Sequence, residues 1–130
     1  MERLVGHIIR GVEISEESVS FRTDTHRITF DAEGECCAHA YLIIPDEKDI
    51  ALIIGQKVVA VQRRGFSRND SQLCEVVDTE FYSIQTHNGD LDLELRTAHN
   101  GYYGGWLTFS SQESVWPIFD DIREEAQKSM

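Results

Sequence analysis

The strongest constraint on the fold is a pair of alternating segments joined by Asn88-Gly89. Residues with apolar character recur at every second position on both sides of this pair: Tyr82, Ile84 and Thr86 before it, and Leu91, Leu93 and Leu95 after it. Such alternation indicates strands with one buried face, and Asn-Gly is the preferred centre of a type I′ turn. The sequence therefore predicts a β-hairpin, with Asp90, Asp92 and Glu94 on its solvent face.

Alternation also appears in the first third of the chain. Residues 8–14, 18–22 and 27–30 each show it, and short polar clusters separate them. Three short alternating runs with tight connections predict an antiparallel meander. Residues 35–44 follow; they are largely apolar on both faces and predict a buried strand.

Two segments have the end signals of helices. Residues 45–55 begin with acidic side chains and end with Gly55, which favours a short central helix. Residues 117–128 begin with proline, carry acids early and a lysine late, and predict a C-terminal helix that docks on the sheet. The predicted fold class is thus α+β, predominantly antiparallel β-sheet with these two helices.

The remaining segments predict more strand and one loop. Residues 57–62 resume a strand, whereas residues 63–71 combine turn-forming residues with three arginines and predict a mobile loop. Residues 102–109 are expected to add a third strand to the hairpin. Gly104-Gly105 within that strand predicts either a bulge or the close approach of another group.

Size and charge limit what the chain can do. It has 130 residues, which fits a single domain spanning 1–130. Acidic residues number 23 and basic residues 12, so the net charge is -11 and direct binding to nucleic acid is not expected. No apolar run reaches the roughly 18 residues of a membrane span, and the N-terminus lacks signal-peptide character. We therefore expect a cytoplasmic protein without membrane contact.

Three short motifs resemble a family of small proteins of unknown function encoded by phages and prophage-bearing bacteria. They are Gly55-x-x-Val58, Glu35-Cys36-Cys37 before an apolar strand, and the late Asn100-Gly101-Tyr102-Tyr103. The resemblance covers about residues 4–110. It implies a compact β-rich domain, a viral or prophage origin with action in the host cytoplasm, and no catalytic residues to transfer.

Three groups of residues could form a binding surface. Tyr102 and Trp106 are expected on one face of their strand, where their rings could stack on a flat ligand or anchor a partner. The arginines at positions 63, 64 and 68 (Arg63, Arg64, Arg68) could hold an anionic group. Alternatively, they could belong to a solvated loop and partly balance the nearby acids Asp70, Glu75, Asp78 and Glu80. The carboxylates of Asp90, Asp92 and Glu94 could steer the protein toward a basic groove.

Cys36, Cys37 and His39 are the only compact group of metal-capable or nucleophilic side chains. On a strand, Cys37 and His39 would share a face and could supply two zinc ligands. No Cys-x-x-Cys pair accompanies them, so packing of small thiols is the favoured interpretation. We expect no metal and no cofactor, with Cys37 and His39 as weak candidates, and reduced thiols because three cysteines fit no disulfide framework.

These observations support three hypotheses about function. The first is a non-enzymatic phage-type accessory protein whose acidic surface binds and inhibits a host protein, such as a defence or nucleic-acid-handling component. The second is a protein that sequesters a small nucleotide-like ligand between the aromatic strand and the arginine segment. The third is an enzyme that uses Cys36, Cys37 or His39. The sequence does not determine the oligomeric state.

Overall fold

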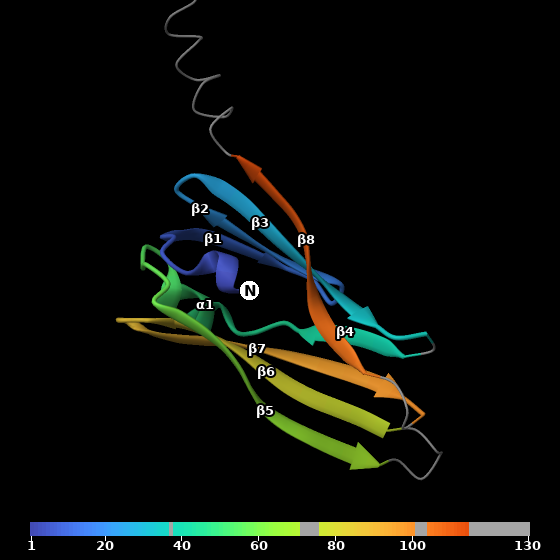
Figure 1. Ribbon diagram of the computed structural model, residues 1–130. Helices are drawn as coiled ribbons and strands as arrows, with labels where there is room; N and C mark the ends of the chain where they lie inside the picture. Colours follow the sequence, from blue (N-terminus) through green and yellow to red (C-terminus); the bar gives the residue numbers. More distant parts are fainter. Residues whose placement is uncertain (37, 71–75, 101–103, 115–130) are drawn as a thin grey trace, which may run out of the picture.

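The chain folds into a sandwich of two four-stranded antiparallel sheets (Figure 1). The computed structural model describes residues 1–36, 38–70, 76–100 and 104–114. The first sheet has the order β1-β2-β3-β8. Its strands are β1 (Ile9–Ile14), β2 (Ser18–Thr23), β3 (His26–Gly34) and β8 (Gly105–Ser114). The second sheet has the order β4-β7-β6-β5. Its strands are β4 (His39–Ile43), β7 (Gly89–His99), β6 (Val76–Thr86) and β5 (Ala60–Asp70).

The core lies between the sheets and is formed by the inward residues of alternating strands. The largest fully buried side chains come from both sheets and from the two short helices: Phe21, Phe30, Leu4, Ile9, Ile28, Leu42, Ile53, Ile84, Leu91, Leu93, Leu95 and Val19. Phe21 and Phe30 meet edge to face, with ring centroids 6.2 Å apart. Burial of these apolar surfaces is the main stabilising contribution to the sandwich.

The predicted meander is confirmed. β1 pairs with β2 and β2 pairs with β3, both antiparallel. Val19 and Phe21 face the core, while the hydroxyl groups of Ser20 and Thr29 meet at 2.7 Å on the opposite face. Alternation in this part of the chain was therefore a sufficient signal for both the strands and their pairing.

The hairpin of β6 and β7 is also confirmed, but its predicted type I′ turn is wrong. The turn is centred on His87-Asn88 and closed by the pair Thr86 and Gly89. Cys36 is the only non-glycine residue with positive φ in the described part of the chain, whereas a type I′ turn needs positive φ at both central residues. The side-chain amide of Asn88 instead donates to the Leu52 carbonyl oxygen at 2.9 Å, which ties the turn to the end of the helix.

The central helix is confirmed as α1 (Glu47–Ile53), with Glu47 and Asp49 in its first turn. A second, shorter helix of the 3-10 type, η1 (Glu2–Leu4), precedes β1 and buries Leu4. The helix predicted at residues 117–128 lies outside the described residues, so the helical part of the α+β prediction rests on α1. The described chain is mostly antiparallel sheet.

The mobile loop predicted for residues 63–71 is wrong. Residues 60–70 form β5, which pairs with β6 and is an edge strand of the second sheet. The register shifts between Arg64 and Ser67, and Gly65 at this bulge has φ +76, a conformation that favours glycine. Because an edge strand pairs on one side only, it tolerates the polar and turn-forming residues that suggested a loop.

The last strand joins the opposite sheet from the one predicted. β8 pairs with β3 in the first sheet instead of extending the hairpin. The predicted close approach at Gly105 is confirmed, since a Cβ atom there would lie 2.2 Å from Thr97 Oγ1 of β7. β8 therefore begins against the second sheet and continues along the first.

The strand predicted over residues 35–44 is shorter than expected. Residues 35–36 belong to a turn, in which the Ala38 N–H donates to the Glu35 carbonyl oxygen at 2.7 Å, and β4 begins only at His39. β4 is an edge strand with an exposed His39, so the interpretation of a fully buried strand is wrong.

Candidate functional site

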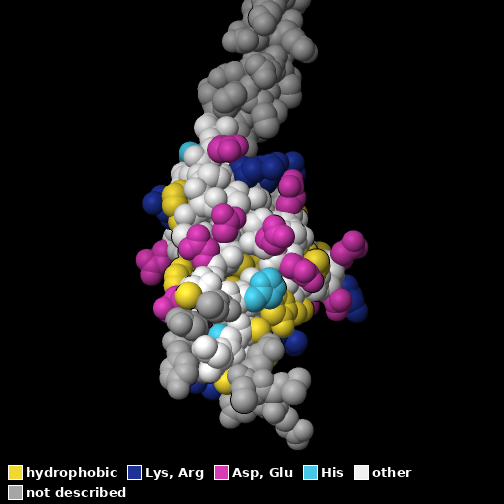
Figure 2. Space-filling model, turned by 90° about the vertical axis from the view of Figure 1, so that its right-hand side faces the viewer, with side chains coloured by type: hydrophobic (Ala, Val, Ile, Leu, Met, Phe, Trp, Pro, Cys, Tyr) yellow, Lys and Arg dark blue, Asp and Glu magenta, His cyan; other side chains and the backbone are white. Residues whose placement is uncertain are grey.

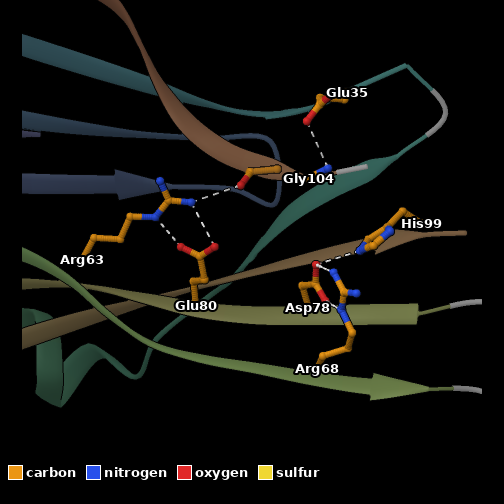
Figure 3. Close-up of polar contacts among 8 residues, drawn as sticks. Glu35, Arg63, Arg68, Asp78, Glu80, His99 and Gly104 are labelled. Carbon is orange, nitrogen blue, oxygen red and sulfur yellow. Dashed lines mark hydrogen bonds and ion pairs between the residues drawn. The ribbon is translucent and has the colours of Figure 1, made fainter. Parts of the chain in front are cut away.

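A charged pocket lies between the second sheet and the start of β8. It has a volume of about 370 Å³. Its lining residues come from four strands and from the turn after β3: Glu35, Arg63, Phe66, Arg68, Asp78, Glu80, Leu95, Thr97, Gly104, Gly105 and Trp106. Figure 3 shows the polar groups of this charged pocket, which segments distant in the sequence bring together.

The first ion pair of the charged pocket joins Arg63 of β5 to Glu80 of β6. The guanidinium donates through Nε and Nη2, the latter to Glu80 Oε1 at 2.9 Å (Figure 3). The hydrogen bond to Glu80 raises the pKa of Arg63 above its ordinary value. Arg63 Nη2 also lies 3.4 Å from the Gly105 carbonyl oxygen, so this residue connects the second sheet to β8.

A second charged cluster joins the exposed Arg68 to the buried side chains of Asp78 and His99. Arg68 donates to both carboxylate oxygens of Asp78 at 2.7 and 3.1 Å, and His99 Nε2 lies 2.7 Å from Asp78 Oδ2. The side chain of Asp78 is 8% exposed and that of His99 is 0% exposed. Burial alone would raise the pKa of Asp78, but the hydrogen bonds from Arg68 and His99 outweigh it, and its pKa lies below the ordinary value.

Tyr82 forms the boundary between the charged pocket and the apolar core. Its hydroxyl oxygen accepts a hydrogen bond from the Leu107 N–H at 3.1 Å, which links β6 to β8. Burial raises the pKa of Tyr82. The guanidinium of Arg63 lies over the Tyr82 ring, 5.4 Å from its centroid. This residue thus holds β8 in place above the second sheet.

Glu35 and Trp106 lie at the edge of the charged pocket and have few partners. Glu35 Oε1 lies 3.3 Å from the Gly104 N–H, and no Lys or Arg of the described chain forms an ion pair with Glu35. Trp106 is half-buried and stands opposite Glu33 in the ladder between β3 and β8. These two side chains are therefore available to a ligand or partner.

A shallow acidic groove adjoins the charged pocket. It has a volume of about 470 Å³, and its polar lining is Glu17, Ser18, Asp31, Glu33 and His39. None of the three carboxylates forms an ion pair with a Lys or Arg in the described ranges. Figure 2 shows the face of the molecule toward which β3 ends; acidic side chains predominate over its middle, and Lys and Arg side chains lie at its margins.

The structure unites some of the predicted binding residues and separates others. Arg63, Arg68 and Trp106 line the charged pocket together. Arg64 points to the other face of β5, where its Nη2 lies 3.7 Å from Asp92 Oδ1 and 3.4 Å from Ser83 Oγ. Tyr102 lies outside the described residues.

The predicted acidic row on β7 faces outward as expected. Asp90 and Asp92 are exposed and Glu94 is partly exposed, while the alternating leucines are buried. This row is partly neutralised, because Glu94 pairs with Arg96 at 2.6 Å and Asp92 lies near Arg64. Among the described ion pairs this row thus leaves only Asp90 without a partner, whereas all three carboxylates of the acidic groove lack one.

Of the thiol and histidine candidates, the structure describes Cys36 and His39. Cys37 lies outside the described residues, and Cys36 is exposed in the turn after β3 with φ 41. His39 stacks on Tyr41, with ring centroids 5.3 Å apart and an interplanar angle of 24°. In the part of the chain that the structure describes, no group of three or more His, Cys, Asp or Glu side chains could hold a metal ion.

Sequence reasoning named Asp78 and Glu80 only as nearby acids that the arginines could balance, and it missed the buried His99 that contacts Asp78. Asp78 and Glu80 are in phase with Tyr82 and Ile84 on the inner face of β6, and His99 is in phase with the leucines of β7. The sequence did contain a signal for these residues. They are charged or titratable, yet they stand at positions that alternation assigns to the core. Such residues indicate either paired buried charges or a gap between the layers.

Comparison with known proteins places this architecture in a family. The model of the family described as "Domain of unknown function (DUF7448)" matches residues 2–109. The chain belongs to this family. It is also similar to an uncharacterised protein of Acanthamoeba polyphaga mimivirus, with 28% identity over 87 residues, which cover 65% of this chain and 68% of the viral protein. No solved structure matches the chain.

The expectation of a β-rich domain from a family of unknown function is thus confirmed, and the chain is similar to one viral protein. A phage origin and the three short motifs stay predictions. No helix in the described ranges is long and apolar enough to cross a membrane.

Proposed function

We propose that this member of the DUF7448 family is a non-enzymatic binding protein that captures a basic host protein through the acidic groove. In this proposal the protein acts in the host cytoplasm and inhibits its partner by covering a basic surface. The observation that carries the proposal is the uncompensated charge of Glu17, Asp31 and Glu33 in an open groove. Their side chains have no Lys or Arg partner in the described chain.

Charge complementarity explains why a protein with a basic surface is the favoured partner. A concentrated field of one sign steers an oppositely charged surface during encounter and disfavours partners of like charge. The net charge of -11 makes nucleic acid an unsuitable partner, but it suits a protein surface that itself binds nucleic acid. Occupation of such a surface would block the partner's normal ligand.

The groove also fits a macromolecular partner better than a small ligand. It is shallow and its carboxylates are exposed or half-buried. Small-molecule sites are usually concave and apolar, with only a few polar groups. A row of exposed charges instead acts on the association rate and on specificity, as expected at the rim of a protein interface.

The test compares two triple variants that remove the same number of charges. The groove variant carries Glu17→Gln, Asp31→Asn and Glu33→Gln; the control carries Asp90→Asn, Asp92→Asn and Glu94→Gln on β7. A partner is first captured from host lysate at low salt and identified by mass spectrometry. Its association rate with the wild type and with both variants is then measured over a range of salt concentrations.

We expect the groove variant to associate about tenfold more slowly at low salt and to lose most of its salt dependence. The control variant should keep its rate within about twofold, because its carboxylates are partly neutralised by arginines. Equal losses in both variants would mean that only net charge matters. Unchanged rates in both would exclude the acidic groove as the binding surface.

A further inference from the structure

We propose that the charged pocket is a subsite for an arginine side chain of the partner, which stacks on Trp106 and pairs with Glu35. This inference rests on the proposed function, since it assumes a basic partner that reaches the charged pocket from the acidic groove. The two sites adjoin because Glu33 of the acidic groove stands directly opposite Trp106 of the charged pocket in the ladder of β3 and β8.

The first argument is that arginine side chains of this protein lie over several of its aromatic rings. Arg68 lies over Phe66 with its guanidinium carbon 5.9 Å from the ring centroid, and Arg63 lies over Tyr82 at 5.4 Å. In the same way Arg3 covers Phe109 at 3.8 Å. Trp106, the ring type that attracts cations most strongly, has no such cation among the described residues. An arginine of the partner would place a cation over Trp106, as arginines of this chain do over Phe66, Tyr82 and Phe109.

The second argument is the charge balance of the charged pocket. Its two arginines are bound to Glu80 and Asp78 by paired hydrogen bonds, which leaves Glu35 as the carboxylate without a cationic partner. Within the described ranges the Glu35 carboxylate accepts one long hydrogen bond, from the Gly104 N–H at 3.3 Å. A cation that enters the charged pocket therefore meets a net negative site whose remaining acceptor is Glu35.

The third argument concerns geometry and favours arginine over lysine. A guanidinium is planar, stacks on aromatic faces and donates two parallel hydrogen bonds to a carboxylate. Trp106 provides the aromatic face and Glu35 the carboxylate at the edge of one pocket. An ammonium group could pair with Glu35 but would gain less from the flat indole surface.

A phosphate-bearing ligand fits this arrangement less well. The arginines that could clamp a phosphate are already engaged by carboxylates, and a phosphate would face Glu35, Asp78 and Glu80 at close range. The nucleotide alternative therefore becomes a competing outcome of the same experiment.

The experiment uses the fluorescence of Trp106 in the full-length chain. The second tryptophan of the sequence is removed by Trp116→Phe so that the signal reports on Trp106 alone. The probe is L-argininamide. In L-citrullinamide a neutral urea replaces the guanidinium while the α-amino group stays, L-lysinamide tests planarity, and adenosine monophosphate tests the nucleotide alternative. Glu35→Gln removes the carboxylate that is proposed to pair with the arginine. The control variant, Glu94→Gln, removes a carboxylate on the outer face of β7.

We expect a saturable change with L-argininamide, at least about tenfold weaker binding of L-lysinamide, and no saturable change with L-citrullinamide. Glu35→Gln should weaken L-argininamide binding by at least about tenfold, while Glu94→Gln should leave it unchanged. Glu35 is exposed, so its substitution should not disturb folding.

Two results would overturn the inference. Equal responses to L-argininamide and L-citrullinamide would show that charge is not recognised, and saturable binding of adenosine monophosphate in place of L-argininamide would show a nucleotide site. If L-argininamide fails but the groove variant still slows capture of the partner, only this inference fails. If L-argininamide binds but the groove variant behaves like its β7 control, only the proposed function fails.

Discussion

The inner face shared by β6 and β7 differs completely between its two ends. At one end Ile84, Leu91 and Leu93 are fully buried in the core, whereas at the other Asp78 and His99 form hydrogen-bonded charged contacts. Both ends follow the same strand alternation. In the described part of the chain no buried side-chain polar atom lacks a hydrogen-bond partner. Alternation therefore defines which face is inner, and the residue types along that face define where the layers enclose a pocket.

The two ends of this face should contribute differently to the free energy of folding. The apolar end should contribute most of the folding free energy, because burial of apolar surface is the main favourable term. The charged end should contribute less, since paired charges must lose their hydration to form. Four variants test this comparison, and the largest effect is expected in the core.

Leu93→Ala should lower the free energy of unfolding by about 3 kcal/mol, because it leaves a cavity at a fully buried position. Urea denaturation at neutral pH measures the change. A loss below about 1 kcal/mol would mean that the apolar end does not dominate stability.

Asp78→Asn should lower the free energy of unfolding by about 2 kcal/mol, because it removes the shared carboxylate of Arg68 and the buried His99. The matched control is Asp24→Asn, which breaks an exposed pair with Arg10 and should change stability by less than about 0.5 kcal/mol. Similar effects from the two variants would contradict the importance of the contacts that the buried Asp78 forms with Arg68 and His99.

The lowered pKa of Asp78 predicts that the destabilisation caused by Asp78→Asn depends on pH. The pKa of Asp78 is lower in the folded state, so its stabilising effect is complete above the ordinary aspartate pKa of about 3.9 and is lost as the pH falls through its folded value. The stability difference between the wild type and Asp78→Asn should therefore shrink below about pH 4. A constant difference down to pH 2 would show that folding does not lower the pKa of Asp78.

Tyr82→Phe should lower the free energy of unfolding by about 1 kcal/mol, because the Leu107 N–H loses its acceptor at the boundary between the two ends. Amide hydrogen exchange gives a local check. Exchange at Leu107 should accelerate more than exchange within β7, and a uniform change would mean that Tyr82 does not specifically hold β8.

The combined change Asp90→Asn, Asp92→Asn and Glu94→Gln should shift the free energy of unfolding by less than about 0.5 kcal/mol. These side chains lie on the outer face of β7, and their ion pairs with Arg64 and Arg96 are exposed. Thermal denaturation measures the effect. A large loss would mean that the outer face supports the core.

Much of the fold could be predicted from local patterns. Val19, Phe21, Leu91 and Leu93 occupy the positions that alternation assigns to the core, and acidic residues mark the start of α1. Each of these signals depends on neighbours within a few residues. Local chemistry is enough to form a strand, a hairpin or a short helix.

The errors involve interactions between distant segments. Residues 63–70 contain Gly65 and three arginines and gave a loop prediction, yet pairing with β6 and ion pairs to Glu80 and Asp78 hold them in a strand. Likewise, no local feature of β8 indicates that it pairs with β3, because the choice depends on packing across the whole sandwich. The charged pocket was therefore only partly predictable: Arg63, Arg68 and Trp106 were named as candidates and Asp78 and Glu80 as acids near the arginines, but their arrangement around one pocket was not predicted.

The pairing of β3 with β8 has a consequence for biosynthesis. His26 pairs with Ser114 and Gly34 with Gly105. One hydrogen-bonding edge of β3 therefore stays unpaired while β4 to β7 are synthesised, until β8, the last of the described strands, follows. Contacts between such distant segments slow folding, because a long loop must close before they form. During translation the nascent chain therefore displays an open β3 edge, and a brief association with a chaperone would protect it until Ser114 emerges from the ribosome.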